Sequence, residues 1–97
     1  MNYPVYLRTG FFSTISCRMS LDEPGISLVP TEVINDQPIC LSWDSILEIF
    51  FLEWENSIEI DILTSNGTYL SIVKDQEQAR RLANELKEDH NIRVRYQ

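Results

Sequence analysis

The sequence predicts an α+β fold in which a bent antiparallel β-sheet is closed by one C-terminal helix. Between residues 58 and 62, isoleucines alternate with acidic residues, and the alternation resumes at Leu70 and Ile72, which is typical of a β-hairpin. The segment after Asp75 repeats its apolar residues at helical spacing, on the stripe formed by Ala79, Leu82, Ala83 and Leu86. A hairpin that leads directly into one amphipathic helix favours a sheet with the helix as its lid.

Residues 65–67 form the turn of this hairpin, and two registers are conceivable. A two-residue turn of the asparagine and the glycine would place Ile62 opposite Ser71 and so mix apolar with polar positions. A three-residue loop places Ile62 opposite Leu70 and keeps the apolar faces together. We therefore predict the three-residue loop, with Gly67 in the left-handed region where it forms a bulge.

Residues at both ends of the predicted helix have the chemistry of helix caps. Asp75 can accept hydrogen bonds from the first unpaired backbone amides, and Gln78 follows it at the spacing of a capping box. Asn91 is expected to end the helix in the left-handed conformation. Residues 92–97 alternate between apolar and basic residues at first, which predicts a short last strand or an extended tail against the sheet.

Short strands and turns are predicted for the first half of the chain. Pro4 places the start of the first strand at a sheet edge, because proline has no amide to donate. In the next segment we expect alternate residues to face the core, namely Phe11, Ser13, Ile15, Cys17 and Met19. The predicted strands cover residues 3–8, 11–19, 26–29 and 39–43, with loops at 21–25 and 31–38 and a bend at 43–45.

Residues 46–54 are the most apolar run, and both faces of a strand built from them would be apolar. One face would hold Leu47, Ile49 and Phe51, and the other Ile46, Phe50, Leu52 and Trp54. A half-buried antiparallel strand normally has one polar face. This segment is therefore either a central strand covered on both faces or a strand whose second face meets a partner. Its period alone also leaves a short helix open.

The composition indicates one acidic globular domain that spans residues 1–97. Hydrophobic residues make up 43% and charged residues 24% of the chain, as in ordinary globular proteins, and the net charge is −7. An acidic protein repels phosphate groups, so we expect no nucleic-acid binding and no binding to membrane lipids, whereas a basic protein partner is compatible. The N-terminus lacks the basic and apolar regions of a signal peptide, and we expect a cytoplasmic protein.

Residues that could carry catalysis or bind a metal are few and scattered. His90 is the only histidine, and no recognisable nucleophile or orienting partner accompanies it. Cys17 and Cys40 sit in apolar or strand-like runs, so we expect buried thiols rather than zinc ligands. The sequence contains no glycine-rich phosphate loop and no calcium loop. We therefore expect no cofactor, no metal site and no enzymatic activity.

A patch of aromatic and acidic residues is the best candidate for a binding site. Aromatic residues flanked by charge are typical of protein interfaces, and burial of the rings in the core is the alternative. The predicted protein-binding residues are Phe50, Leu52, Glu53, Trp54 and Glu55. They would contact a protein partner or a second copy in a homo-oligomer. A second hypothesis is an acidic inhibitor or immunity-type protein that binds a basic partner through Glu53, Glu55, Glu59 and Asp61.

The order of these segments resembles the small bacterial PH-like (GRAM-like) domains. The resemblance covers about residues 11–90 and rests on ISLVPTEV, then ICLSWDSILEIFFLE with its step from Trp43 to Ile46, then IEIDILTSNGTYLSIV, then DQEQARRLANEL. It implies a partly open, strongly bent antiparallel barrel capped by the helix, and a binding or scaffolding module rather than an enzyme. Lipid-binding members carry basic residues between their first two strands, where this chain has the acidic loop 21–25, so a lipid role is not carried over.

Overall fold

The computed structural model describes residues 2–32 and 37–97, which form a mixed β-sheet, an α-helix and a short 3₁₀ helix. The strands are β1 (Asn2–Arg8), β2 (Thr14–Leu21), β3 (Gly25–Pro30), β4 (Ile39–Ser42), β5 (Ile46–Glu53), β6 (Ile58–Thr64), β7 (Gly67–Val73) and β8 (Val94–Tyr96). The 3₁₀ helix η1 (Trp43–Ser45) precedes β5, and the α-helix α1 (Gln76–Asp89) precedes β8. The predicted loop over 31–38 falls partly outside the described residues.

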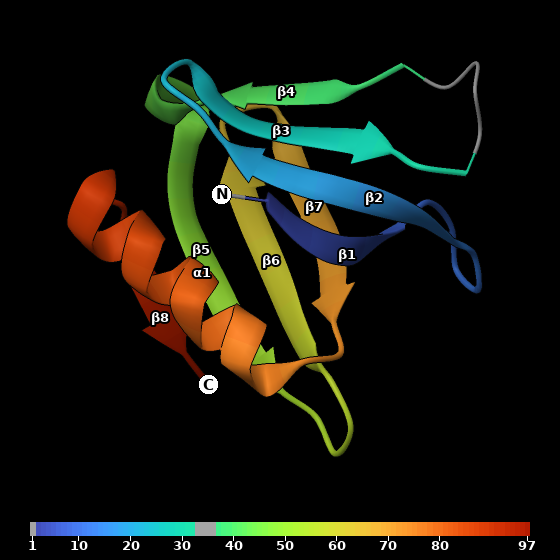
Figure 1. Ribbon diagram of the computed structural model, residues 1–97. Helices are drawn as coiled ribbons and strands as arrows, with labels where there is room; N and C mark the ends of the chain where they lie inside the picture. Colours follow the sequence, from blue (N-terminus) through green and yellow to red (C-terminus); the bar gives the residue numbers. More distant parts are fainter. Residues whose placement is uncertain (1, 33–36) are drawn as a thin grey trace.

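The sheet is built from two antiparallel meanders that cross at a steep angle (Figure 1). β1 to β4 form the first and β5 to β7 the second, in the order β4-β3-β2-β1-β7-β6-β5-β8. The meanders join where Tyr6 pairs with Ile72 and Leu7 with Ser71. Pro4 lies outside this join, where β1 pairs with β2 alone, as expected of a proline at an edge. β4 and β8 are the edges of the described sheet, so the barrel is partly open, as predicted.

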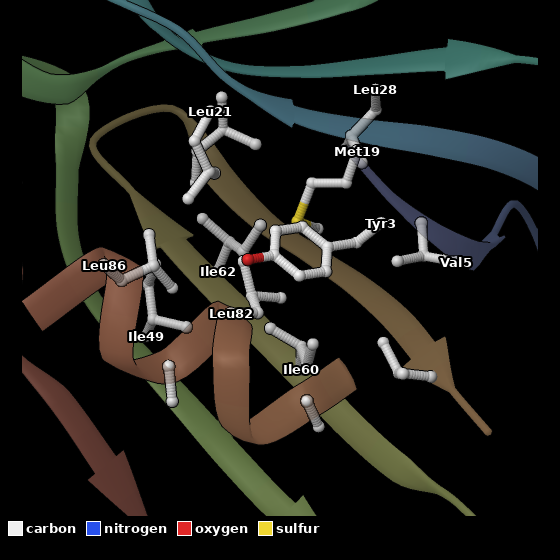
Figure 2. Packing of buried hydrophobic residues seen from close by; sticks show 14 of the residues in the cluster. Tyr3, Val5, Met19, Leu21, Leu28, Ile49, Ile60, Ile62, Leu82 and Leu86 are labelled. Carbon is white, nitrogen blue, oxygen red and sulfur yellow. The ribbon is translucent and has the colours of Figure 1, made fainter. Parts of the chain in front are cut away.

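α1 lies across the inner side of β5 and β6, and the hydrophobic core fills the space between the helix and the sheet (Figures 1 and 2). Figure 2 shows Leu82 and Leu86 of α1 near Ile49, Ile60 and Ile62 of the sheet. The residues that the helix buries are Ala79, Leu82, Ala83 and Leu86, which confirms the predicted stripe. Each fully buried leucine or isoleucine contributes about 2 kcal/mol to folding, so this layer holds the helix in place.

The predicted caps of α1 are confirmed. The Asp75 side chain accepts hydrogen bonds from the backbone amides of Glu77 at 2.9 Å and Gln78 at 3.4 Å. Asn91 adopts the left-handed conformation, with a φ of 55°. The predicted last strand is β8, and it runs parallel to β5, so the sheet is mixed rather than wholly antiparallel.

The turn of the β6–β7 hairpin differs from the prediction. Its loop has two residues, Ser65 and Asn66, and Gly67 already pairs with Thr64, so both registers considered from the sequence are wrong. The Thr64 hydroxyl fixes this turn, because it donates to the Gly67 carbonyl at 2.8 Å and accepts from the Asn66 amide at 3.2 Å. Gly67 has a φ of 141°, a positive value that glycine adopts readily, but the pairing contains no bulge.

This register reverses the expected faces of β7. Ile60 pairs with Ser71 instead of Ile72, and Ser71 and Val73 are buried. The Ser71 hydroxyl donates to the Ile60 carbonyl at 3.5 Å, which lets a polar residue occupy the core side. Leu70 and Ile72 therefore lie on the opposite side of the sheet, where they are half-buried.

A β-bulge changes which residues of β5 face the core. The pairing of β5 with β6 shifts between Ile46 and Glu48, so Leu47 is an extra residue. The bulge brings Ile46 to the buried side with Ile49 and Phe51, and it leaves Leu47 64% exposed. The predicted division of this strand into faces is thus wrong before the bulge and correct after it, and the helical alternative is excluded.

Phe11, Ser13 and Cys40 were predicted to be buried, but they are exposed. Phe11 and Ser13 belong to the loop between β1 and β2, because the Thr9 amide donates to the Ser13 carbonyl at 2.9 Å and closes the loop before the strand begins. The Phe11 side chain is 94% exposed. Cys17 is buried as predicted, but Cys40 is exposed on the edge strand β4, and no disulfide joins the two.

Candidate protein-binding site

The five predicted binding residues divide into two groups at the end of β5. Phe50 and Leu52 are half-buried on the outer side of the sheet, away from the core residues that alternate with them. Glu53 ends the strand, Trp54 and Glu55 follow it in the β5–β6 turn, and all three are exposed. The structure therefore brings the five residues to one end of the molecule but not onto one face of the strand.

The β5–β6 turn presents Trp54 on a closed loop. The Trp54 amide donates to the Ser57 carbonyl at 2.9 Å, which fixes the backbone of the turn. The Trp54 side chain is 58% exposed, so the core alternative does not apply to it, whereas Phe51 is buried. A large aromatic side chain on a fixed backbone loses little conformational entropy when it contacts another protein.

A pocket of about 290 Å³ lies close to this turn, between the start of α1, the end of β5 and β8. Its apolar lining comes from Phe51, Ile58, Ala79 and Tyr96, and its polar lining from Glu53, Gln76, Arg80 and Gln97. The Gln76 side-chain amide donates to the Glu53 carboxylate at 3.3 Å, which ties the helix to the end of the strand. A pocket of this volume is at the small end for a ligand site and suits one inserted side chain better than a cofactor.

A second surface is the outer face of β1, β7, β6 and β5, and the sequence analysis named only some of its residues, on β5 and β6. We use "outer face" for the side of these strands that points away from α1, and in Figure 1 the helix covers the opposite side of β5 and β6. Asp61 lies between Leu70 and Phe50 in one row across the strands. The apolar members of the outer face are Tyr6, Phe50, Leu52, Leu63, Leu70 and Ile72.

The carboxylates of the outer face have unequal partners. Glu59 lies 3.9 Å from the Arg8 guanidinium, and Glu48 accepts a hydrogen bond from Arg95. The Oδ1 atom of Asp61 is buried and has no hydrogen-bond partner within residues 2–32 and 37–97. Burial, followed by the neighbouring Glu59 carboxylate, raises the pKa of Asp61 to about 7, and the Arg8 charge opposes this shift. Asp61 is thus the carboxylate of this surface that lacks a strong cationic partner.

His90 holds the end of α1 against η1. Its ring stacks on Trp43 with 4.1 Å between the centroids and 19° between the planes, and the Trp43 indole donates to the Asp22 carbonyl at 2.8 Å. Among the described residues, no group of three or more His, Cys, Asp or Glu side chains is arranged to hold a metal ion. In that same part of the chain, no helix has the length and apolar character needed to cross a membrane.

Comparison with known proteins bears on the fold. No family model and no curated protein matches this chain. The chain is similar to a chain in the solved structure titled "Structure of the Spt16D Pob3N heterodimer", with 18% sequence identity and a TM-score of 0.70. The similarity covers 100% of this chain and 53% of that chain, so this chain spans about half the length of its neighbour. At this identity the match shows the fold alone, and it confirms the predicted PH-like α+β architecture.

Proposed function

We propose that this chain is a non-enzymatic protein-interaction module that contacts its partner through the end of β5. One observation carries the proposal: an exposed tryptophan on a closed turn lies near a small pocket with apolar and polar lining residues. Trp54 supplies an anchor for the partner, and the pocket receives a side chain from it. Glu53 and Glu55 flank the anchor, and Phe50 and Leu52 extend the contact onto the sheet.

Capture of partners from the native lysate, followed by titration of the partner so identified, tests this proposal. We expect Trp54→Ala to weaken binding about 30-fold or more, because a central aromatic anchor contributes about 2 kcal/mol or more to a protein interface. Leu47→Ala is the matched control, since Leu47 is an exposed apolar residue of the same strand at its other end. Equal binding by the two variants would remove Trp54 from the site.

The second candidate is an acidic inhibitor or immunity-type protein that neutralises a basic partner. The exposed carboxylates of Glu53 and Glu55 on either side of Trp54 favour it. Electrostatic steering acts mainly on the association rate and weakens with salt. For this candidate, Glu53→Gln with Glu55→Gln should slow association and flatten its salt dependence, whereas Trp54→Ala should mainly speed dissociation. Binding kinetics that do not change with salt would exclude it.

A further inference from the structure

We infer that the outer face binds the outer face of a second copy of this chain, which gives a two-fold homodimer with the Trp54 turn left accessible. This inference goes beyond the proposed function, because it concerns an additional partner, a second copy of the chain. It assigns to that partner a surface centred on Leu70, Asp61 and Ile72, away from the pocket.

The first argument is the apolar character of an uncovered sheet face. A two-layer domain covers one side of its sheet, and the side left in water is normally polar. Here α1, the α-helix of the described residues, covers the inner side of the sheet. On the outer face, one row across the strands runs from Ile72 through Glu59 to Leu52, so two of its three residues are apolar. Tyr6 extends the same row on β1 and is 37% exposed. An apolar sheet face in this position is typical of a contact surface.

The second argument is the distribution of charge. Two copies of a protein with net charge −7 repel one another, so they can associate most readily where both signs are present. The outer face combines the Arg8 guanidinium with the carboxylates of Glu48, Glu59 and Asp61, and Arg95 of the neighbouring strand β8 adds a second guanidinium beside Glu48. Most of the negative charge therefore lies elsewhere on the molecule. A two-fold interface brings identical surfaces together, and a surface that carries both signs can pair with itself.

The third argument is the unpaired acceptor at the centre of the surface. Asp61 has apolar neighbours on both sides, Phe50 and Leu70, and its Oδ1 atom lacks a hydrogen-bond partner among the described residues. The Arg8 pair with Glu59 is loose, at 3.9 Å, so that guanidinium can turn toward another carboxylate. In the dimer, Arg8 of one copy faces the Glu59 and Asp61 pair of the other, and the two-fold axis repeats this contact. This mixture of charges favours a second copy over a strongly basic partner.

Sedimentation equilibrium of the wild-type chain up to millimolar concentration tests the inference directly. We expect a monomer–dimer equilibrium and an increase of about 100-fold in the dimer dissociation constant for Ile72→Asp. Val29→Asp makes the same kind of change at an exposed apolar position on β3, away from the outer face, and should leave the constant within about 2-fold of wild type, as surface positions outside an interface do. A wild-type chain that stays monomeric throughout, or equal effects of the two variants, would overturn the inference.

Amide chemical shifts of the wild-type chain, followed on dilution, give a test that needs no variant to fold. The shifts of Phe50, Leu70 and Ile72 should change with concentration, and the Trp54 indole signal should not. Concentration-dependent shifts confined to Trp54 or to the edge strand β4 would place the contact elsewhere and contradict the inference. Failure here is separate from failure of the proposed function: a monomer that still captures a partner through Trp54 refutes only the dimer, and a dimer without that capture refutes only the proposed site.

Discussion

The two faces of the β5–β6–β7 meander contain similar apolar residues but have different neighbours. On the inner face, Ile49 and Ile60 are almost inaccessible to solvent beneath α1. On the outer face, Phe50 and Ile72 lie half-buried among charged side chains, and α1 lies on the other side. The difference teaches that the number of apolar residues in a strand does not identify its core side. What identifies it is the element that covers that side.

The largest expected effect comes from truncating a side chain of α1 that packs on the inner face. Leu82→Ala should lower the free energy of unfolding by about 2–5 kcal/mol, because Leu82 is completely buried and its removal leaves a cavity. Leu52→Ala deletes the same atoms from the outer face and should cost about 1 kcal/mol or less in a monomer, since Leu52 stays partly in water. Urea unfolding at low protein concentration measures both values. Equal losses would mean that the two faces are equally covered.

A smaller effect is expected from the carboxyl of the outer face. The pKa of Asp61 rises from 3.8 to about 7 on folding, so the native state holds its proton more tightly than the unfolded state. This group therefore makes the fold most stable below about pH 4 and destabilises it progressively as the pH rises to 7. We expect Asp61→Asn to remove this decline and to be more stable than wild type at pH 8 by about 2 kcal/mol, after allowance for solvent screening of the carboxyl.

Urea midpoints between pH 4 and pH 8 measure this prediction for Asp61, whose pKa lies inside that range. Glu55→Gln removes one negative charge from an exposed position and is the control for the change in net charge. The Asp61 variant should differ from wild type increasingly as pH rises, and the Glu55 variant should follow the wild-type curve. Parallel curves for all three proteins would show that the outer face does not hold its carboxyl in a desolvated state.

The smallest effect is expected from the N-terminal cap of α1, the helix that covers the inner face. Asp75→Ala removes the side chain that accepts from the amides of Glu77 and Gln78, and it should cost about 1 kcal/mol. Asp75→Asn keeps a capping side chain, so it should lower the free energy of unfolding by only a few tenths of a kcal/mol. Thermal unfolding gives the size, and amide exchange should quicken in the first turn of the helix for the alanine variant alone. Identical exchange in both variants would show that packing, not the cap, sets the start of the helix.

The helix and its ends could be predicted because their determinants are local. The spacing of the apolar residues, the Asp75 cap and the left-handed Asn91 act within one or two turns of the chain. The register of the β6–β7 hairpin could not be predicted, because the Thr64 hydroxyl selects a loop that apolar pairing alone disfavours. The bulge at Leu47 depends on pairing with β6, and the sequence of one strand does not contain that information.

The candidate site was predicted in part for the same reason. The sequence left the exposure of Trp54 open, because its acidic neighbours favour an interface and the apolar run over residues 46–54 favours burial. The pocket could not be predicted, because its lining comes from β5, β6, α1 and the last residues of the chain, which only the fold brings together. The part of the outer face on β7 was missed because the wrong hairpin register placed Leu70 and Ile72 in the core.

β8 has a consequence for the behaviour of the protein at high concentration. The longest apolar strand, β5, would otherwise present a bare row of backbone amides and carbonyls, and such a row is a template on which other chains can aggregate. Three residues of β8 occupy that row, and the edge left at the other end of the described sheet is the four-residue strand β4. This short segment thus shields the edge of β5 from fibril-like growth, and disturbing it should impair solubility.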